Sequence, residues 1–321
     1  MRDPVSVDWF EDAKNFGPVV QGKITVQAAD AIDLRGGPLD LQCLGTLARL
    51  SGRTVTVHSD YLTITRGELP VRADIWTEAL PEIARALGQI SEQTLMARRA
   101  VMFDRAASRI AARADASGLA LSGLTRDDVD ILAHRHPYSH FFALDELELT
   151  HKRFDGQRSQ PMERAVFLAC DAVLVLPYDP VRDHVLLVEQ FRAGPWGRHD
   201  PKPWQIEPIA GRIDAGETPE AAARREAHEE AGLQLDTLEL IGRSYPSPGT
   251  STEFYHMFAS FCDLPPSLVG QHGLAEENED IQTHLMAFET LDAYAQEGRI
   301  SNLPLLTAIH WLARRRSLLS A

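Results

Sequence analysis

The chain has 321 residues, 44% of them hydrophobic and 24% charged, which is typical of a soluble globular protein with room for two domains. Its net charge of −14 excludes nucleic acid as a bulk partner, because binding to a phosphate backbone needs a basic surface. With three scattered cysteines, no secretory leader and no apolar run long enough to span a bilayer, we expect a cytoplasmic protein without a membrane partner.

The first 120 residues predict a small α+β domain of unknown role. A helix is expected over residues 39–50, and the alternating, β-branched segment 54–65 predicts one or two strands. A long helical pattern follows over residues 76–114, with a break near Gly88. It places four apolar side chains on one stripe, which we interpret as core packing: Val101, Met102, Ala106 and Ile110.

The segment 115–125 is rich in small residues, as domain boundaries are, so we expect a second domain over residues 125–321. Residues 127–156 alternate well enough for two or three strands ending in a turn. Four histidines fall on or beside these strands, and their irregular spacing favours polar surface over a metal site: His134, His136, His140 and His151.

The apolar run over residues 165–176 predicts one buried strand, and a second strand over 183–190 leads into Phe191 and Arg192. An arginine that leaves a buried strand beside an acidic helix is well placed to bind phosphate, because its planar fork pairs two oxygens at once. The alternative for Arg192 is a salt bridge to a glutamate of that helix. Arg164, just before the first strand, is a second candidate.

The segment 211–233 predicts a loop followed by a helix. Thr218 suits the N-cap, Pro219 the first helical position, and Gly232 the left-handed residue that ends a helix.

Three carboxylates share one face of this helix, because Glu226, Glu229 and Glu230 stand at positions i, i+3 and i+4. At an effective dielectric near 20, each pair repels by roughly 3 kcal/mol. A solvated acidic face is one interpretation. A divalent cation bound by these hard oxygen ligands is the other, since it would turn the repulsion into attraction.

The same segment resembles the Nudix box, G-x5-E-x7-R-E-U-x-E-E-x-G-U, where U is apolar. Ala227 and Leu233 occupy the apolar positions, and the fixed positions are Gly211, Glu217, Arg225, Glu226, Glu229, Glu230 and Gly232. The resemblance implies a hydrolase of nucleoside diphosphates linked to another moiety. It also implies an α/β (α+β) fold, an α/β/α sandwich around a mixed sheet, beside the smaller N-terminal domain.

Three further motifs resemble the ADP-ribose pyrophosphatases within that family: VEQFR at 188–192, SPG at 247–249 and GLAEENED at 273–280. This resemblance covers residues 127–316. It implies hydrolysis of ADP-ribose to AMP and ribose 5-phosphate with Mg²⁺, for which Mn²⁺ is a possible substitute.

Roles for individual residues follow from the resemblance. Metal ligands are the carbonyl of Ala210 and the side chains of Glu226, Glu229, Glu230 and Glu279. Glu277 matches the general base, and Arg225 orients the glutamates, so the catalytic set is Glu277, Arg225 and Glu230. The substrate-binding candidates are Arg164, Arg192, Glu207 and Gly249.

Three alternatives remain open. Another sugar nucleotide, such as GDP-mannose, would use the same catalytic residues, because the box binds only the diphosphate. A non-catalytic ADP-ribose-binding regulator would be expected to lack a box glutamate or to carry a DNA-binding domain, and the sequence shows neither sign. The N-terminal unit could itself be the functional part, as an interaction module. The resemblance also implies a homodimer in which the strands over 127–154 cross to the second subunit.

Overall fold

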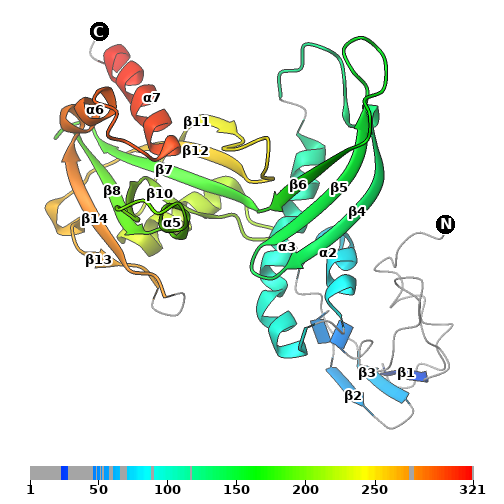
Figure 1. Ribbon diagram of the computed structural model, residues 1–321. Helices are drawn as coiled ribbons and strands as arrows, with labels where there is room; N and C mark the ends of the chain where they lie inside the picture. The colour runs from blue at the N-terminus through cyan, green and yellow to red at the C-terminus, as the bar shows by residue number, and fades with distance from the viewer. Residues whose placement is uncertain are drawn as a thin grey trace. The chain divides into compact units, whose positions relative to one another are not determined.

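The computed structural model describes residues 23–27, 46–47, 49–50, 52, 54–57, 61–65, 71–87, 90–115, 118–274 and 278–319. The chain divides into two compact units, Met1–Ala169 with Asp214–Gly216, and Cys170–Ile213 with Glu217–Ala321 (Figure 1). The boundary expected between residues 120 and 125 stays a prediction. In the part of the chain that the structure describes, no helix has the length and apolar character that a membrane span requires.

The described residues of the first unit include the helices α2 and α3 and two three-stranded antiparallel sheets, ordered β1-β3-β2 and β4-β5-β6. Its elements are β1 (Lys23–Gln27), β2 (Thr54–Val57), β3 (Tyr61–Thr65), α2 (Ala73–Ala86), α3 (Glu92–Ala114), η4 (Arg126–Asp128), β4 (Val129–Ser139), β5 (Ala143–His151) and β6 (Met162–Leu168).

Most predictions for this unit are confirmed. The strands expected over 54–65 are β2 and β3, and the helical pattern over 76–114 is α2 and α3. The predicted apolar stripe lies in the core, where Met102 and Ala106 are fully buried and Ile110 packs against them. The helix expected over 39–50 lies largely outside the described residues.

The second unit is built on an eight-stranded mixed sheet, ordered β11-β12-β7-β8-β14-β13, with β10 paired to β7 and β9 to β8. Among the strand pairs of this sheet that the structure describes, only β7–β12 is parallel. The elements are β7 (Asp171–Asp179), β8 (His184–Phe191), α4 (Ala193–Gly197), β9 (Trp204–Glu207), β10 (Ile209–Arg212), α5 (Pro219–Ala231), β11 (Glu239–Ser244), β12 (Phe254–Phe261), η5 (Pro266–Leu268), β13 (Gln271–His272), β14 (Ile281–Ala287), α6 (Phe288–Gln296) and α7 (Leu303–Leu319).

Helices cover both faces of this sheet, as the predicted α/β/α sandwich requires. Successive strand residues point to opposite faces. Val173 of β7 and Leu186 of β8 therefore pack in the cluster that contains the buried alanines of α5. Their near neighbours Leu176 and Leu187 pack in a second cluster, against α6 and α7. The first cluster holds α5 on one face of the sheet, and the second holds α6 and α7 on the other.

The single strand predicted over 165–176 is wrong. The structure has two strands there, since β6 ends at Leu168 and β7 begins at Asp171, and the two belong to different sheets. The apolar run continues through the change of sheet, so hydrophobic periodicity gives no sign of it. The thiols are as expected where described: Cys170 is buried and Cys262 is partly buried, while Cys43 lies outside the described residues.

Candidate active site

Helix α5 begins and ends at the residues that the sequence predicts. Thr218 is the N-cap, and its hydroxyl accepts a hydrogen bond from the backbone N–H of Ala221 at 3.2 Å. Pro219 occupies the first turn, where its missing N–H leaves no hydrogen bond unmade. Gly232 closes the helix in the left-handed conformation, with φ of 60°. The caps end the helix at these residues, and its buried alanines, packed against the sheet, set the direction of the acidic face.

Gly211 on β10 makes room for the first carboxylate of the helix. A side chain at this position would overlap the Glu226 carboxylate, because its Cβ would lie 2.5 Å from Oε2 and still closer to Oε1 and Cδ. The Glu226 side chain, 12% exposed, is therefore seated directly on the backbone of β10. The close approach gives this glycine of the box a steric reason.

Arg225 ties the acidic residues together. Its guanidinium contacts Glu226 at 2.6 Å, Glu229 at 3.1 Å and both carboxylate oxygens of Glu217, at 2.9 and 3.1 Å. It also donates to the backbone carbonyl of Arg212 at 2.9 Å. One cation thus holds three glutamates against β10, which is the geometry that an orienting residue needs.

Glu230 is the most buried carboxylate of the group, with 2% exposure. It accepts a hydrogen bond from the backbone N–H of Ala210 at 3.1 Å, and Gln190 approaches it at 3.5 Å. In an antiparallel strand the N–H and C=O of one residue point to the same side. Because the Ala210 N–H points to Glu230, its carbonyl oxygen also turns away from β7, toward the acidic face of α5.

The electrostatics of the cluster favour a bound cation. The pKa of Glu230 is raised to about 8: burial is the largest cause and the negative charges of Glu226 and Glu279 add to it, whereas the hydrogen bond from Ala210 and the charge of Arg192 lower it. The pKa of Glu226 is raised to about 7: burial is the largest cause, Arg225 lowers it, and the charges of Glu229 and Glu279 add to the rise. A cation surrounded by these oxygens would compensate their repulsion. Carboxylate and carbonyl oxygens are the ligands that Mg²⁺ and Mn²⁺ prefer, so the residues fit such ions.

The second acidic segment is described only in part. Glu279 is partly buried, accepts a hydrogen bond from the backbone N–H of Leu274 at 3.3 Å, and lies within electrostatic reach of Glu226 and Glu230. Glu277, the predicted general base, lies outside the described residues.

Arg192 forms a salt bridge, but its partner is not a glutamate of α5. The guanidinium binds one carboxylate oxygen of Glu207 on β9, at 2.6 and 2.9 Å. The other oxygen of Glu207 accepts a hydrogen bond from Asn302 at 3.2 Å. Burial lowers the pKa of Arg192, and the Glu207 contact outweighs this and raises it overall. Its side chain remains 40% exposed, so Glu207 holds an accessible cation in a fixed position.

Two other substrate-binding candidates stay predictions. Arg164 lies on β6 in the first unit, is exposed, and donates to the backbone carbonyl of Glu163 at 2.7 Å. Gly249 lies in the exposed turn after β11, where Thr250 and Ser251 donate backbone hydrogen bonds to the carbonyl of Ser247 at 3.1 and 3.0 Å.

A partly buried pair at the start of β12, Glu253 and Tyr255, was not predicted, because no local pattern in the sequence points to it. The hydroxyl of Tyr255 donates to the Glu253 carboxylate at 3.2 Å, and burial raises the pKa of both side chains. Both interact electrostatically with Arg192. Gln190 was also not predicted as a site residue. It is buried near the end of an apolar strand, and a buried glutamine needs a polar partner, so its position in the sequence was a usable signal.

Comparison with known proteins agrees with this geometry. A model of the NUDIX domain matches residues 169–306. An ADP-ribose pyrophosphatase of Escherichia coli strain K12 is 38% identical over 187 residues, covering 58% of this chain and 88% of that protein. The chain belongs to the Nudix family.

Two further relatives carry different names. An ADP-ribose pyrophosphatase of Haemophilus influenzae is 38% identical over 192 residues, covering 59% of this chain and 87% of the relative. A GDP-mannose pyrophosphatase of Cronobacter sakazakii is 28% identical over 188 residues, covering 59% of this chain and 96% of that protein. Nudix hydrolases generally use divalent metals, and the carboxylates of α5 provide suitable ligands. The N-terminal part of the chain is an extension outside the matched region.

Proposed function

We propose that this Nudix hydrolase cleaves the pyrophosphate bond of ADP-ribose, with Mg²⁺ or Mn²⁺, to give AMP and ribose 5-phosphate. The observation that carries the proposal is the seating of Glu226 on Gly211 with Arg225 linking the glutamates. This arrangement assembles buried anionic oxygens that need a cation. The substrate follows from the relatives at 38% identity, which are named ADP-ribose pyrophosphatases.

The metal ligands in this proposal are oxygen atoms only. Glu226, Glu229, Glu230 and Glu279 would supply carboxylates, and Ala210 its carbonyl. Divalent ions in such a site lower the pKa of bound water and neutralise charge on the attacking and leaving oxygens. Arg225 keeps the glutamates in position while charge on the substrate changes. Glu277 would accept the proton of the attacking water, a role that contributes roughly 10²–10⁴-fold.

In this proposal Arg192 binds the substrate. Its partly exposed guanidinium can pair with phosphate oxygens on the side that Glu207 does not occupy. Both oxygens of Glu207 already have partners, so we assign Glu207 to positioning Arg192 rather than to direct contact with substrate. Arg164 and Gly249 would complete the binding residues.

A panel of substrates assayed with Mg²⁺ tests the proposal. We expect the highest kcat/KM for ADP-ribose and release of AMP and ribose 5-phosphate. The alternative is another sugar nucleotide, and the 28% identical GDP-mannose pyrophosphatase makes GDP-mannose the compound to compare first. A higher kcat/KM for GDP-mannose would refute the substrate assignment. Binding of ADP-ribose without turnover would identify a regulator instead.

We also propose that the protein is a homodimer. Three aromatic side chains on the β4–β5 hairpin are about half exposed: Tyr138 (48%), Phe141 (53%) and Phe142 (46%). Toward the other end of β4, Ile131 and Leu132 are exposed to a similar degree. Apolar side chains gathered on one strand pair are typical of a surface that meets a partner.

A further inference from the structure

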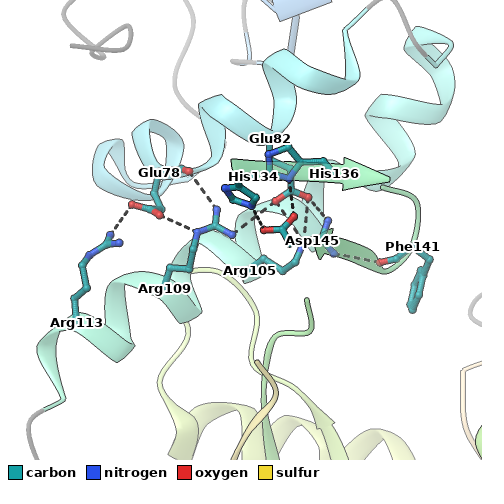
Figure 2. Close-up of polar contacts among 9 residues, drawn as sticks. All are labelled: Glu78, Glu82, Arg105, Arg109, Arg113, His134, His136, Phe141 and Asp145. Carbon is teal, nitrogen blue, oxygen red and sulfur yellow. Dashed lines mark hydrogen bonds and ion pairs between the residues drawn. The ribbon is translucent and has the colours of Figure 1, made fainter. Parts of the chain in front are cut away.

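A group of metal-ligating side chains lies on the β4–β5 hairpin of the first unit, away from the carboxylates of α5 in sequence and in ligand type. His134 Nε2 lies 2.6 Å from one carboxylate oxygen of Asp145, and His136 Nδ1 lies 2.6 Å from the other (Figure 2). The two imidazole rings are 4.1 Å apart, centroid to centroid. The three side chains therefore converge on one point.

The strand pairing explains how they meet. Arg135 pairs with Glu146 and Tyr138 with Leu144 in the antiparallel ladder, so His136 and Pro137 lie opposite Asp145, in an irregularity between those two pairs. His134, two residues earlier, projects from the same face of β4. The register then shifts before Tyr138, at an irregularity that contains Pro137, a residue without an N–H to donate.

The nearby arginines pair with other carboxylates, so the histidines are the partners of Asp145. Figure 2 shows the arginines of α3 directed at glutamates of α2. Arg105 binds Glu82, and Arg109 binds Glu78 at 2.8 Å. Among the described residues, the polar contacts of Asp145 are those with the two imidazoles. Its side chain is 14% exposed, so its charge is poorly screened by water.

Two imidazoles and one carboxylate form a ligand set for a borderline transition metal rather than for Mg²⁺. Each contact at 2.6 Å needs a proton on the imidazole nitrogen, and one divalent ion can replace both protons. The nitrogen and oxygen atoms all lie within 4.8 Å of one another. Around tetrahedral zinc, with bonds of about 2.0–2.1 Å, they would be roughly 3.3 Å apart, a distance that small side-chain rotations reach.

We propose that His134, His136 and Asp145 bind one Zn²⁺ ion, with the fourth tetrahedral position open to water. The site is separate from the carboxylates of α5, which offer oxygen atoms only. A bound ion would cross-link β4 to β5 beside the irregularity at Pro137 and so hold the hairpin in its register. This differs from the interpretation of these histidines as polar surface, because the third ligand lies on the next strand.

Metal content of the full-length protein tests the proposal. The protein is stripped with a chelator, loaded with Zn²⁺ and dialysed against excess Mg²⁺. A variant carrying both Glu226→Gln and Glu230→Gln is treated in the same way, so that zinc on α5 cannot be mistaken for zinc on the hairpin. We expect one zinc per chain in both proteins. Co²⁺ as a second probe should give the strong visible absorption of a tetrahedral site with nitrogen ligands.

His136→Ala and the nearly isosteric Asp145→Asn should each lose this ion while keeping Mg²⁺-dependent turnover, which also reports that the chain is folded. His151→Ala is the matched control, because His151 lies on the same hairpin with its ring bonded to the carbonyl of Lys152 at 2.9 Å, and it should keep the ion. Absence of zinc from the Glu226→Gln, Glu230→Gln protein, or retention of zinc by Asp145→Asn, would overturn the proposal.

Discussion

Replacing Gly211 by alanine tests whether the backbone of β10 positions the Glu226 carboxylate. The added Cβ would lie 2.5 Å from Oε2 and closer to the other carboxylate atoms, whereas ordinary contact begins at 3.4 Å. The carboxylate must therefore retreat by at least about 0.9 Å, the difference between the two distances. A displacement of about 1 Å at a reacting centre can cost on the order of 10²-fold in rate.

The fold should tolerate the change better than the activity does. The clash falls on the end of a flexible side chain, so we expect the free energy of unfolding to fall by no more than about 1–3 kcal/mol, the range for overpacking. Turnover of ADP-ribose should fall by on the order of 10²-fold, and half-maximal activity should need more Mg²⁺.

Initial rates over a range of Mg²⁺ concentrations, with urea unfolding on the same protein, separate the two effects. Gly242→Ala is the matched control, since Gly242 lies in β11 of the same sheet and an added Cβ there meets open space. Wild-type turnover and an unchanged Mg²⁺ requirement in Gly211→Ala would refute the steric argument.

Three further predictions concern the loop, the charges and the assembly. Glu277→Gln should lower turnover by about 10²–10⁴-fold with little change in the Mg²⁺ requirement, whereas Glu279→Gln should raise that requirement; exchanged phenotypes would reverse the assignments. Without metal, Glu226 and Glu230 have pKa values raised above their usual 4.5, so the folded state retains protons that the unfolded state releases. The free energy of unfolding in chelator should therefore fall as pH rises from about 5 to 8, and Mg²⁺ should restore it most at pH 8. A free energy of unfolding that increases with pH in chelator would contradict this. Deleting residues 1–120 should leave a dimer by light scattering, and a fully active monomer would exclude a pocket shared between subunits.

Local sequence signals predicted helix α5 almost residue by residue. The N-cap at Thr218, Pro219 in the first turn and the left-handed Gly232 each depend only on near neighbours in the chain. The spacing of the carboxylates is also local, because positions i, i+3 and i+4 share a helix face whatever surrounds the helix. For this reason the acidic face could be found without the fold.

Features that depend on strand pairing could not be found in this way. Arg192 and Glu207 meet because β8 pairs with β9, and Asp145 meets two histidines because of the register between β4 and β5. Neither partner is set by a fixed spacing in sequence. The break between β6 and β7 was missed for a related reason, since both strands are apolar and only their pairing distinguishes the two sheets.

The turnover of Glu230→Gln at saturating Mg²⁺ tests most directly whether the acidic face of α5 carries the reaction. Glutamine keeps the shape and can still accept the N–H of Ala210, so the fold should survive. The exposed Glu220 on the first turn of the same helix provides the control, as Glu220→Gln. We expect ADP-ribose turnover to fall by several orders of magnitude in Glu230→Gln and to stay at the wild-type rate in the control. Near-wild-type turnover in Glu230→Gln would contradict a role for this helix in the mechanism.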